Sequence, residues 1–114
     1  MQYMEFAGRV TRISVTGHAE PIVRVSGYAG AANCIRDVYL ERDGKGYQIV
    51  RNQSLDRLSQ EASYCNGDYL FYRNWRGNTY AILSEFSARD SSLTVFRMTA
   101  KLELESVCSV RWSE

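Results

Sequence analysis

The chain has 114 residues, of which 45% are hydrophobic and 24% charged, and its formal net charge is +1. This composition excludes a disordered or fibrous chain, and the length suits one domain with a substantial core. The near-neutral charge excludes a strong overall field that would attract nucleic-acid phosphates. We therefore predict a single compact domain over residues 1–114.

The first half of the chain alternates apolar and polar residues with a period of two, which is typical of half-buried strands. The alternation changes phase near Thr11 and Arg12, which indicates a bulge in the first strand. Gly44 and Gly46, in the stretch 43–46, indicate a tight hairpin turn between the third and fourth strands. The predicted strands of this half cover residues 4–15, 22–28, 34–42 and 47–51.

One helix is predicted, over residues 54–64. Ser54 is a suitable N-cap, because its hydroxyl can accept a hydrogen bond from a free backbone N–H. Leu55, Leu58 and Ala62 then fall on one stripe at spacings of three and four residues, as expected of a short helix that covers an apolar surface.

Strands resume after the helix, at residues 68–75, 79–88 and 93–105, with a break near residue 100, and a last edge strand is predicted at 107–112. The order is therefore strands, one short helix and strands again. This order predicts a mostly β fold with one short helix and favours a small OB-like barrel. An SH3-like barrel or an open α+β sheet would give much the same order.

The sequence carries no motif that identifies a reaction. Its single histidine, His18, lies in a turn, and the chain has no nucleophile elbow, phosphate-binding loop or zinc-ligand spacing. The carboxylate pairs Glu41/Asp43 and Glu103/Glu105 are typical of solvent-facing strand ends, although a hydrolase-like barrel built on one of them is a weaker alternative. We predict a non-enzymatic protein without cofactor or metal.

Cys34, Cys65 and Cys108 are odd in number and far apart, which does not suggest a disulfide framework. We expect reduced, mostly buried thiols. The N-terminus has no secretory pattern, and no apolar run approaches the length needed to span a bilayer. Together these features predict a cytoplasmic protein with no membrane partner.

The stretch YLFYRNWRGNTYAI, residues 69–82, carries five aromatic side chains and two arginines and no acid. Its function depends on the register of one hairpin, because a slip of one residue exchanges the two faces of a strand. With Gly77 and Asn78 as the two turn residues, Trp75 faces Tyr80. Most of the rings then lie in the core, together with Ile82 and Phe86.

A three-residue turn over 76–78 makes Asn74 face Tyr80 instead. Leu70 and Tyr72 then point to the core with Tyr80, Ile82 and Phe86, whereas Tyr69, Phe71, Arg73 and Trp75 point to solvent. Glycine at the first turn position favours the two-residue register, and Asn78 tolerates the left-handed conformation that the other register needs.

The exposed form of this hairpin suits single-stranded nucleic acid, because bases stack on aromatic rings and arginine adds charge and cation–π contact. The leading hypothesis is a small binding module for single-stranded DNA or RNA. The alternative is a protein–protein interaction module, an inhibitor, adaptor or assembly subunit, which uses the same hairpin or an exposed sheet edge. The oligomeric state stays open, with a homo-oligomer among the alternatives. The predicted partner-binding residues are Tyr69, Phe71, Tyr72, Arg73, Trp75, Arg76, Arg9, Arg12 and Arg24.

Overall fold

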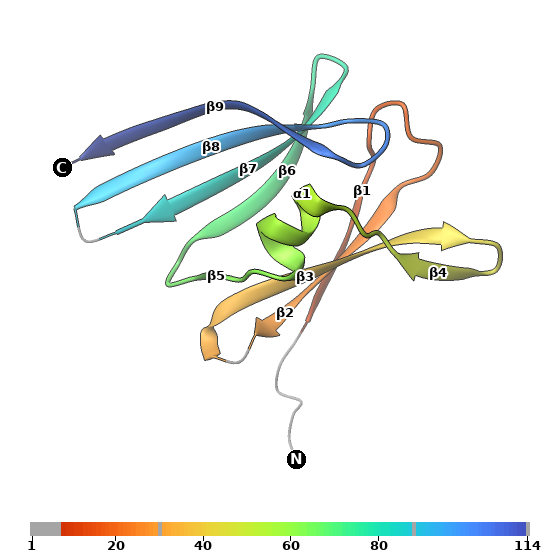
Figure 1. The fold of residues 1–114 in the computed structure, drawn as a ribbon, viewed down its shortest axis with the longest axis horizontal. Coiled ribbons are helices and arrows are strands. Elements are labelled where there is room, and N and C mark those ends of the chain that lie inside the picture. The colour runs from red at the N-terminus through yellow and green to blue at the C-terminus, as the bar shows by residue number, and fades with distance from the viewer. Residues whose placement is uncertain (1–7, 30, 88, 114) are drawn as a thin grey trace.

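The computed structural model describes residues 8–29, 31–87 and 89–113 and consists mostly of β-strands with one short helical segment (Figure 1). This confirms the mostly β prediction. The start of the first predicted strand, residues 4–7, lies outside the described residues. The strands are β1 Arg9–Ile13, β2 Ile22–Ala29, β3 Ala31–Asp43, β4 Gly46–Ile49, β5 Tyr64–Cys65, β6 Tyr69–Trp75, β7 Asn78–Phe86, β8 Asp90–Met98 and β9 Leu104–Ser113.

The strands form two antiparallel sheets. The first has the order β1-β2-β3-β4, and the short β5 also pairs with β3. The second has the order β6-β7-β8-β9 and extends beyond the first toward the C-terminus (Figure 1). Among the described strands, no pairing joins the two sheets into a closed barrel. The fold is thus two open sheets packed against each other, with the helical segment that begins at α1 (Gln53–Leu55) between them (Figure 1).

The bulge predicted near Thr11 and Arg12 is wrong. β1 pairs with β2 in continuous register from Arg9, opposite Ser26, to Ile13, opposite Ile22. The apparent phase change arises because Val10 is 64% exposed on this edge strand, whereas Ile13 points into the core. Register shifts occur instead between residues 28 and 29 of β2 and between residues 95 and 96 of β8.

The helical segment is shorter than predicted and begins one residue earlier. An α-helical turn, α1 Gln53–Leu55, runs into a π-helical turn over Asp56–Gln60. The cap is Asn52 and not Ser54: the Asn52 side chain accepts a hydrogen bond from the backbone N–H of Leu55 at 2.9 Å. Asn52 is therefore the residue that satisfies the free backbone donor at this helix start.

The π-helical turn also changes which side chains are buried. It adds one residue to a helical turn, and this change of phase brings Ser59 and Gln60 inward while Ala62 is exposed. The Gln60 amide accepts from the backbone N–H of Tyr39 at 2.9 Å and donates to the Val50 carbonyl at 2.7 Å. These bonds tie the segment to the first sheet.

The hairpin between β6 and β7 adopts neither of the two predicted registers. Arg73 faces Tyr80, and the turn residues are Arg76 and Gly77, with φ values of 48° and 79°. Positive φ at both positions is the signature of a type I′ turn, which matches the twist of the flanking strands. The prediction that Gly77 and Asn78 form the turn is therefore wrong, and the turn lies one residue earlier in the chain.

This register decides which side chains reach the core. Leu70 and Ala81 are fully buried, and so is Thr79. The ring-rich face with Phe71 and Tyr80 points away from the first sheet. The two-residue register, which turn chemistry favours, places most of these rings in the core, and this prediction is wrong, because Tyr69 and Trp75 are 47% and 59% exposed. The expectation of both registers that Tyr80 joins the core is also wrong. Thr79 and Ala81 are small, so the inward face of β7 lets the first sheet approach closely.

The main core lies where α1 and the first sheet meet one end of the second sheet. Its buried residues are Ile13, Val15, Ile22, Tyr39, Val50, Leu55, Met98 and Leu102. Thr79 adds a polar tie, since the Thr16 backbone N–H donates to its hydroxyl at 3.0 Å. Among the described residues, no helix is long and apolar enough to cross a membrane.

The prediction that all three cysteines are reduced is wrong for two of them. Cys34 and Cys65 form a disulfide, because β5 returns antiparallel to β3 and places them directly opposite each other. They are separated by 31 positions in the chain, so no local spacing signals this pairing. Cys108 is free and exposed, not buried. The expected cytoplasmic location thus loses the support it drew from reduced thiols.

Candidate functional site

The outward face of β6 carries a short ladder of stacked side chains. The rings of Tyr69 and Phe71 lie 5.6 Å apart with an angle of 26° between their planes. The guanidinium of Arg73 lies 5.9 Å from the centre of the Phe71 ring. Because they alternate along one strand, these three side chains stand on one face of a rigid sheet. The arrangement offers ring faces and a cation side by side.

A groove runs between β1 of the first sheet and β6 of the second. It has a volume of about 250 Å³. Its lining brings together seven of the nine predicted partner-binding residues, which come from three strands: Arg9, Arg12, Arg24, Tyr69, Phe71, Tyr72 and Arg73. A second hollow of about 180 Å³ continues from it and shares Arg9, Arg24 and Tyr69. Two edge strands distant in sequence therefore form the two walls of one groove.

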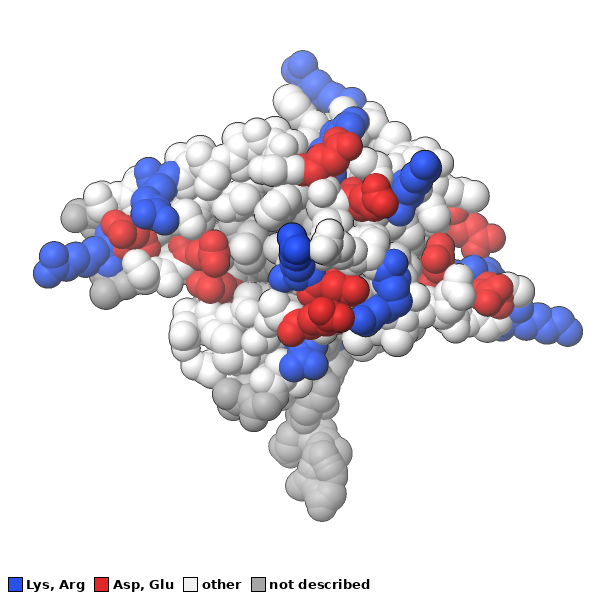
Figure 2. Space-filling view, in the orientation of Figure 1, with Lys and Arg blue, Asp and Glu red and all other residues white. Residues whose placement is uncertain are grey.

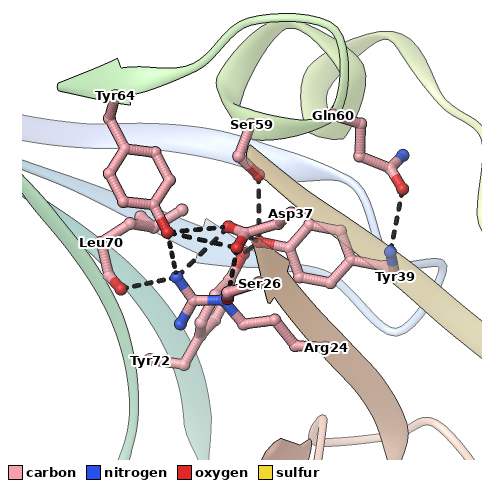
Figure 3. A network of polar contacts seen from close by, with 9 residues as sticks. All are labelled: Arg24, Ser26, Asp37, Tyr39, Ser59, Gln60, Tyr64, Leu70 and Tyr72. Atoms are coloured by element: carbon pink, nitrogen blue, oxygen red, sulfur yellow. Dashed lines mark hydrogen bonds and ion pairs between the residues drawn. The ribbon is translucent and has the colours of Figure 1, made fainter. Parts of the chain in front are cut away.

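The floor of the groove rests on a buried polar network around Asp37 (Figure 3). The Asp37 carboxylate lies 3.2 Å from a guanidinium nitrogen of Arg24. It also accepts hydrogen bonds from the hydroxyls of Ser26 at 2.6 Å, Tyr39 at 3.2 Å and Tyr64 at 3.2 Å. A buried carboxylate is stable only with such compensation.

Arg24 connects the two sheets through this network. The same guanidinium nitrogen donates to the Leu70 carbonyl on β6 at 2.7 Å. Burial alone would lower the pKa of Arg24, but Tyr39 and Asp37 outweigh it and raise this pKa above its usual value. Its Nε is buried and has no hydrogen-bond partner among the described residues. Arg24 is thus a charged residue in the floor with one unsatisfied donor.

Three tyrosines of the network are held neutral. Burial raises the pKa of Tyr39 and of Tyr72, whose hydroxyls lie 2.6 Å apart. Burial also raises the pKa of Tyr64, and the negative charge of Asp37 adds to the effect. The Tyr72 ring lies edge-on to Tyr39 and under the Arg24 guanidinium, 5.2 Å from its centre. Tyr72 is therefore fixed within the sheet interface, and its hydroxyl points into the network.

The remaining two predicted residues lie at the tip of the hairpin, outside the groove lining. Trp75 is 59% exposed, and the Arg76 guanidinium lies 4.7 Å from the centre of its ring. Trp75 continues the alternation of Phe71 and Arg73 on β6, but the pair lies at the hairpin tip, beyond the groove lining.

The weaker candidates from the sequence are engaged in local contacts. His18 donates a hydrogen bond from Nδ1 to the Ala100 carbonyl at 3.0 Å, and its Nε2 lies 3.7 Å from a Glu41 oxygen. Glu105 pairs with Arg97 at 2.6 Å. Among the described residues, no group of three or more His, Cys, Asp or Glu side chains is placed to hold a metal ion.

Sequence reasoning missed the centre of the network, Asp37. One signal was present: Asp37 is in phase with Ile35 and Tyr39 on β3, so it falls on the apolar side of the alternation. An acid at such a position needs buried donors, and two of its partners, Arg24 and Tyr64, come from distant parts of the chain. Periodicity alone does not bring them together.

No family model matches the chain, and no curated protein and no solved structure is similar to it.

Proposed function

We propose that the protein is a small, non-enzymatic binding module whose β1–β6 groove holds single-stranded nucleic acid. One observation carries the proposal: four arginines and a stacked pair of rings line one groove, and none of its described lining residues is Asp or Glu. Backbone phosphates suit the arginines, and bases suit the ring faces. The OB-like architecture predicted from the order of the elements stays a prediction that belongs to the same proposal, since no pairing among the described strands closes the two sheets into a barrel.

The local charge of the groove supports the proposal even though the net charge of the chain is only +1. Charges of both signs are mixed over the face seen in Figure 2 and form no field of one sign there. The groove differs, because Arg9, Arg12 and Arg73 project from its two walls.

The test is a fluorescence-anisotropy titration of a labelled oligothymidine with the full chain at low salt. We expect binding that weakens with added salt. Tyr69→Ala should weaken it by about 5- to 150-fold, because one stacked base contributes roughly 1–3 kcal/mol. Arg12→Gln should weaken it less, through loss of one phosphate contact.

Arg57→Gln is the matched control, since Arg57 is an exposed arginine on the helical segment, outside the groove lining. It should bind as the wild type does. Absence of binding at low salt would overturn the proposal. Equal weakening by Arg57→Gln and Arg12→Gln would also overturn it, because attraction would then depend on total charge and not on the groove.

The alternative, a protein-interaction module, is favoured by a separate observation. Exposed large apolar side chains, which include Trp75, Phe86, Val110 and Trp112, occur on the second sheet and its hairpin tip. Exposed apolar patches on a folded protein mark interaction surfaces. This observation does not involve the arginines of the groove.

A further inference from the structure

The two faces of the second sheet differ where the sheet extends beyond α1 (Figure 1). On the face turned toward α1 and the first sheet, the strand pairing aligns Leu83 with Thr94 and Ser109 in one row. The next row on this face aligns Glu85, Ser92 and Arg111. Apart from Leu83, these side chains are polar or charged, as expected of a surface that meets water.

The outer face at the same positions is apolar. One row across β7, β8 and β9 aligns Ile82, Val95 and Cys108, and the next aligns Ser84, Leu93 and Val110. Val110 is 54% exposed and the neighbouring Trp112 is 44% exposed. Alternation along a strand normally turns the polar side to water. Here the apolar side is exposed in the single chain, which indicates that a partner molecule covers it.

Charge on this outer face is confined to the end near the hairpin. Arg73, Arg97 and Glu105 lie in one row with Tyr80. Arg97 and Glu105 are already paired with each other at 2.6 Å. The rows with Ile82 and Leu93 hold no charged residue on β7, β8 or β9. A partner for this region therefore needs an apolar surface and no complementary charges.

The size of the face suits a stable dimer. β7, β8 and β9 are 9, 9 and 10 residues long. With strands about 4.8 Å apart and a rise of about 3.3 Å per residue, a four-stranded face of this length has a projected area of roughly 600 Å². The accessible area of side chains exceeds the projected area, so the face approaches the ~800 Å² per partner of a standard interface.

We propose that this face binds the same face of a second copy of the chain, with Ile82, Val95 and Val110 at the centre. Sheets pack face to face at about −30° when their twists match, and two identical sheets have identical twist. The interface is isologous, so an uncharged apolar centre meets an uncharged apolar centre. β6 forms the edge of this face, and its Phe71 and Tyr69 lie in the rows of Ile82 and Ser84 while they also line the groove, so the dimer and the groove ligand would compete for these two rings.

The experiment is sedimentation velocity of the full chain over a concentration series. We expect a monomer–dimer equilibrium that is populated as a dimer at about 100 µM, where a Kd of about 10 µM or tighter gives mostly dimer. Val110→Glu should weaken dimerisation at least tenfold, because it would place a charge in the apolar centre. Ile49→Glu is the matched control, since Ile49 is 48% exposed on β4 of the other sheet.

A second measurement uses the wild-type protein and avoids the risk that a variant misfolds. Cys108 is the free thiol on this face, while Cys34 and Cys65 are bonded to each other. Its reaction with a thiol reagent should slow as protein concentration rises. A monomer at all concentrations would overturn the proposal. A dimer that is weakened by Ile49→Glu and not by Val110→Glu, or in which Cys108 reacts at the monomer rate, would also overturn it.

Discussion

At the scale of single residues, Asp37 has the largest structural consequence. It is fully buried and lies against Arg24, whose side chain is almost buried as well. Removing one partner of a buried ion pair leaves an uncompensated charge, which typically costs about 3–5 kcal/mol. The contacts of Arg24 with Leu70 and of Tyr72 with Tyr39 make this network the polar joint between the two sheets.

Asp37→Asn should therefore lower the free energy of unfolding by about 3–5 kcal/mol, measured by urea denaturation. Glu105→Gln is the control, because Glu105 forms its ion pair with Arg97 on the exposed face. That change should leave the unfolding midpoint where it is in the wild type. Similar losses for both variants would contradict the assignment of Asp37 to a buried network.

The tyrosines of the network predict a loss of stability at alkaline pH. Their pKa values are raised in the folded protein, above the ordinary value of 10.0 that the unfolded chain shows. As pH rises, the tyrosines of the unfolded state therefore lose their protons first. Their contribution to the free energy of unfolding is complete below pH 10, and the free energy of unfolding falls as pH rises above 10. Tyr39 and Tyr72 each contribute a slope of up to about 1.4 kcal/mol per pH unit, and the more exposed Tyr64 contributes less.

Unfolding in urea at several pH values between 8 and about 11 checks this expectation. Tyr72→Phe removes one of the raised groups, so it should lower stability at neutral pH and make the alkaline decline shallower. A decline as steep as that of the wild type would show that Tyr72 does not titrate as the structure implies.

At the scale of elements, the β6–β7 turn shows how a local choice is decided by distant contacts. The sequence places Gly77 beside Asn78, and this pair suits two positive φ values at least as well as Arg76 with Gly77. The structure uses Arg76 and Gly77. This register sets Thr79 opposite Asn74, where it meets Thr16 of the first sheet.

Gly77→Ala should lower the free energy of unfolding by about 1–2 kcal/mol, because an alanine at a φ of 79° would have to adopt the left-handed region, which its Cβ disfavours. A Cβ there meets no atom within 4 Å, so the loss arises from backbone strain alone. Thermal unfolding gives the measurement.

Gly46→Ala provides the comparison, since Gly46 follows the other tight turn and its φ is not positive. That change should be neutral or slightly stabilising, through a less flexible unfolded chain. If Gly77→Ala proved as harmless as Gly46→Ala, the type I′ turn would be contradicted.

At the scale of the whole molecule, the groove exists only because two sheets meet. Arg9 and Arg12 lie on β1, whereas Tyr69, Phe71 and Arg73 lie on β6, about sixty positions later in the chain. The proposed ligand would contact both sheets at once. The proposed dimer uses the outer face of the second sheet, whose β6 edge carries Tyr69 and Phe71, so the ligand and the second copy would compete for these rings.

The proposed nucleic-acid binding has a defined salt dependence. Arg9, Arg12 and Arg73 project from the walls of the groove, and each phosphate contact to a single strand contributes a slope of about −0.7 in log K against log salt. We expect a slope of about −2, measured by repeating the oligothymidine titration over a salt series. Arg73→Gln should reduce the slope by about 0.7. A slope near zero would contradict phosphate contacts in the groove.

The sequence by itself determined most of the strands, though not β5, together with the single helical segment and the ring-and-arginine content of β6. These follow from periods of two, from glycine turns and from composition, all of which are local. The predicted end of the helix is wrong, because Gln60 is buried by hydrogen bonds to the backbone of Tyr39 and Val50, and both residues lie outside the helical segment.

Only the tertiary structure decided the register of the β6–β7 hairpin, the Cys34–Cys65 bond and the meeting of Arg12 with Phe71. A one-residue slip changes every side chain's face at little local cost, so turn propensity does not select it. Packing does, because the observed register keeps Leu70 and Ala81 on the buried face and also sets Thr79 opposite Asn74, where it meets Thr16 of the first sheet. The candidate site therefore follows from long-range packing acting on side chains that the sequence had already supplied.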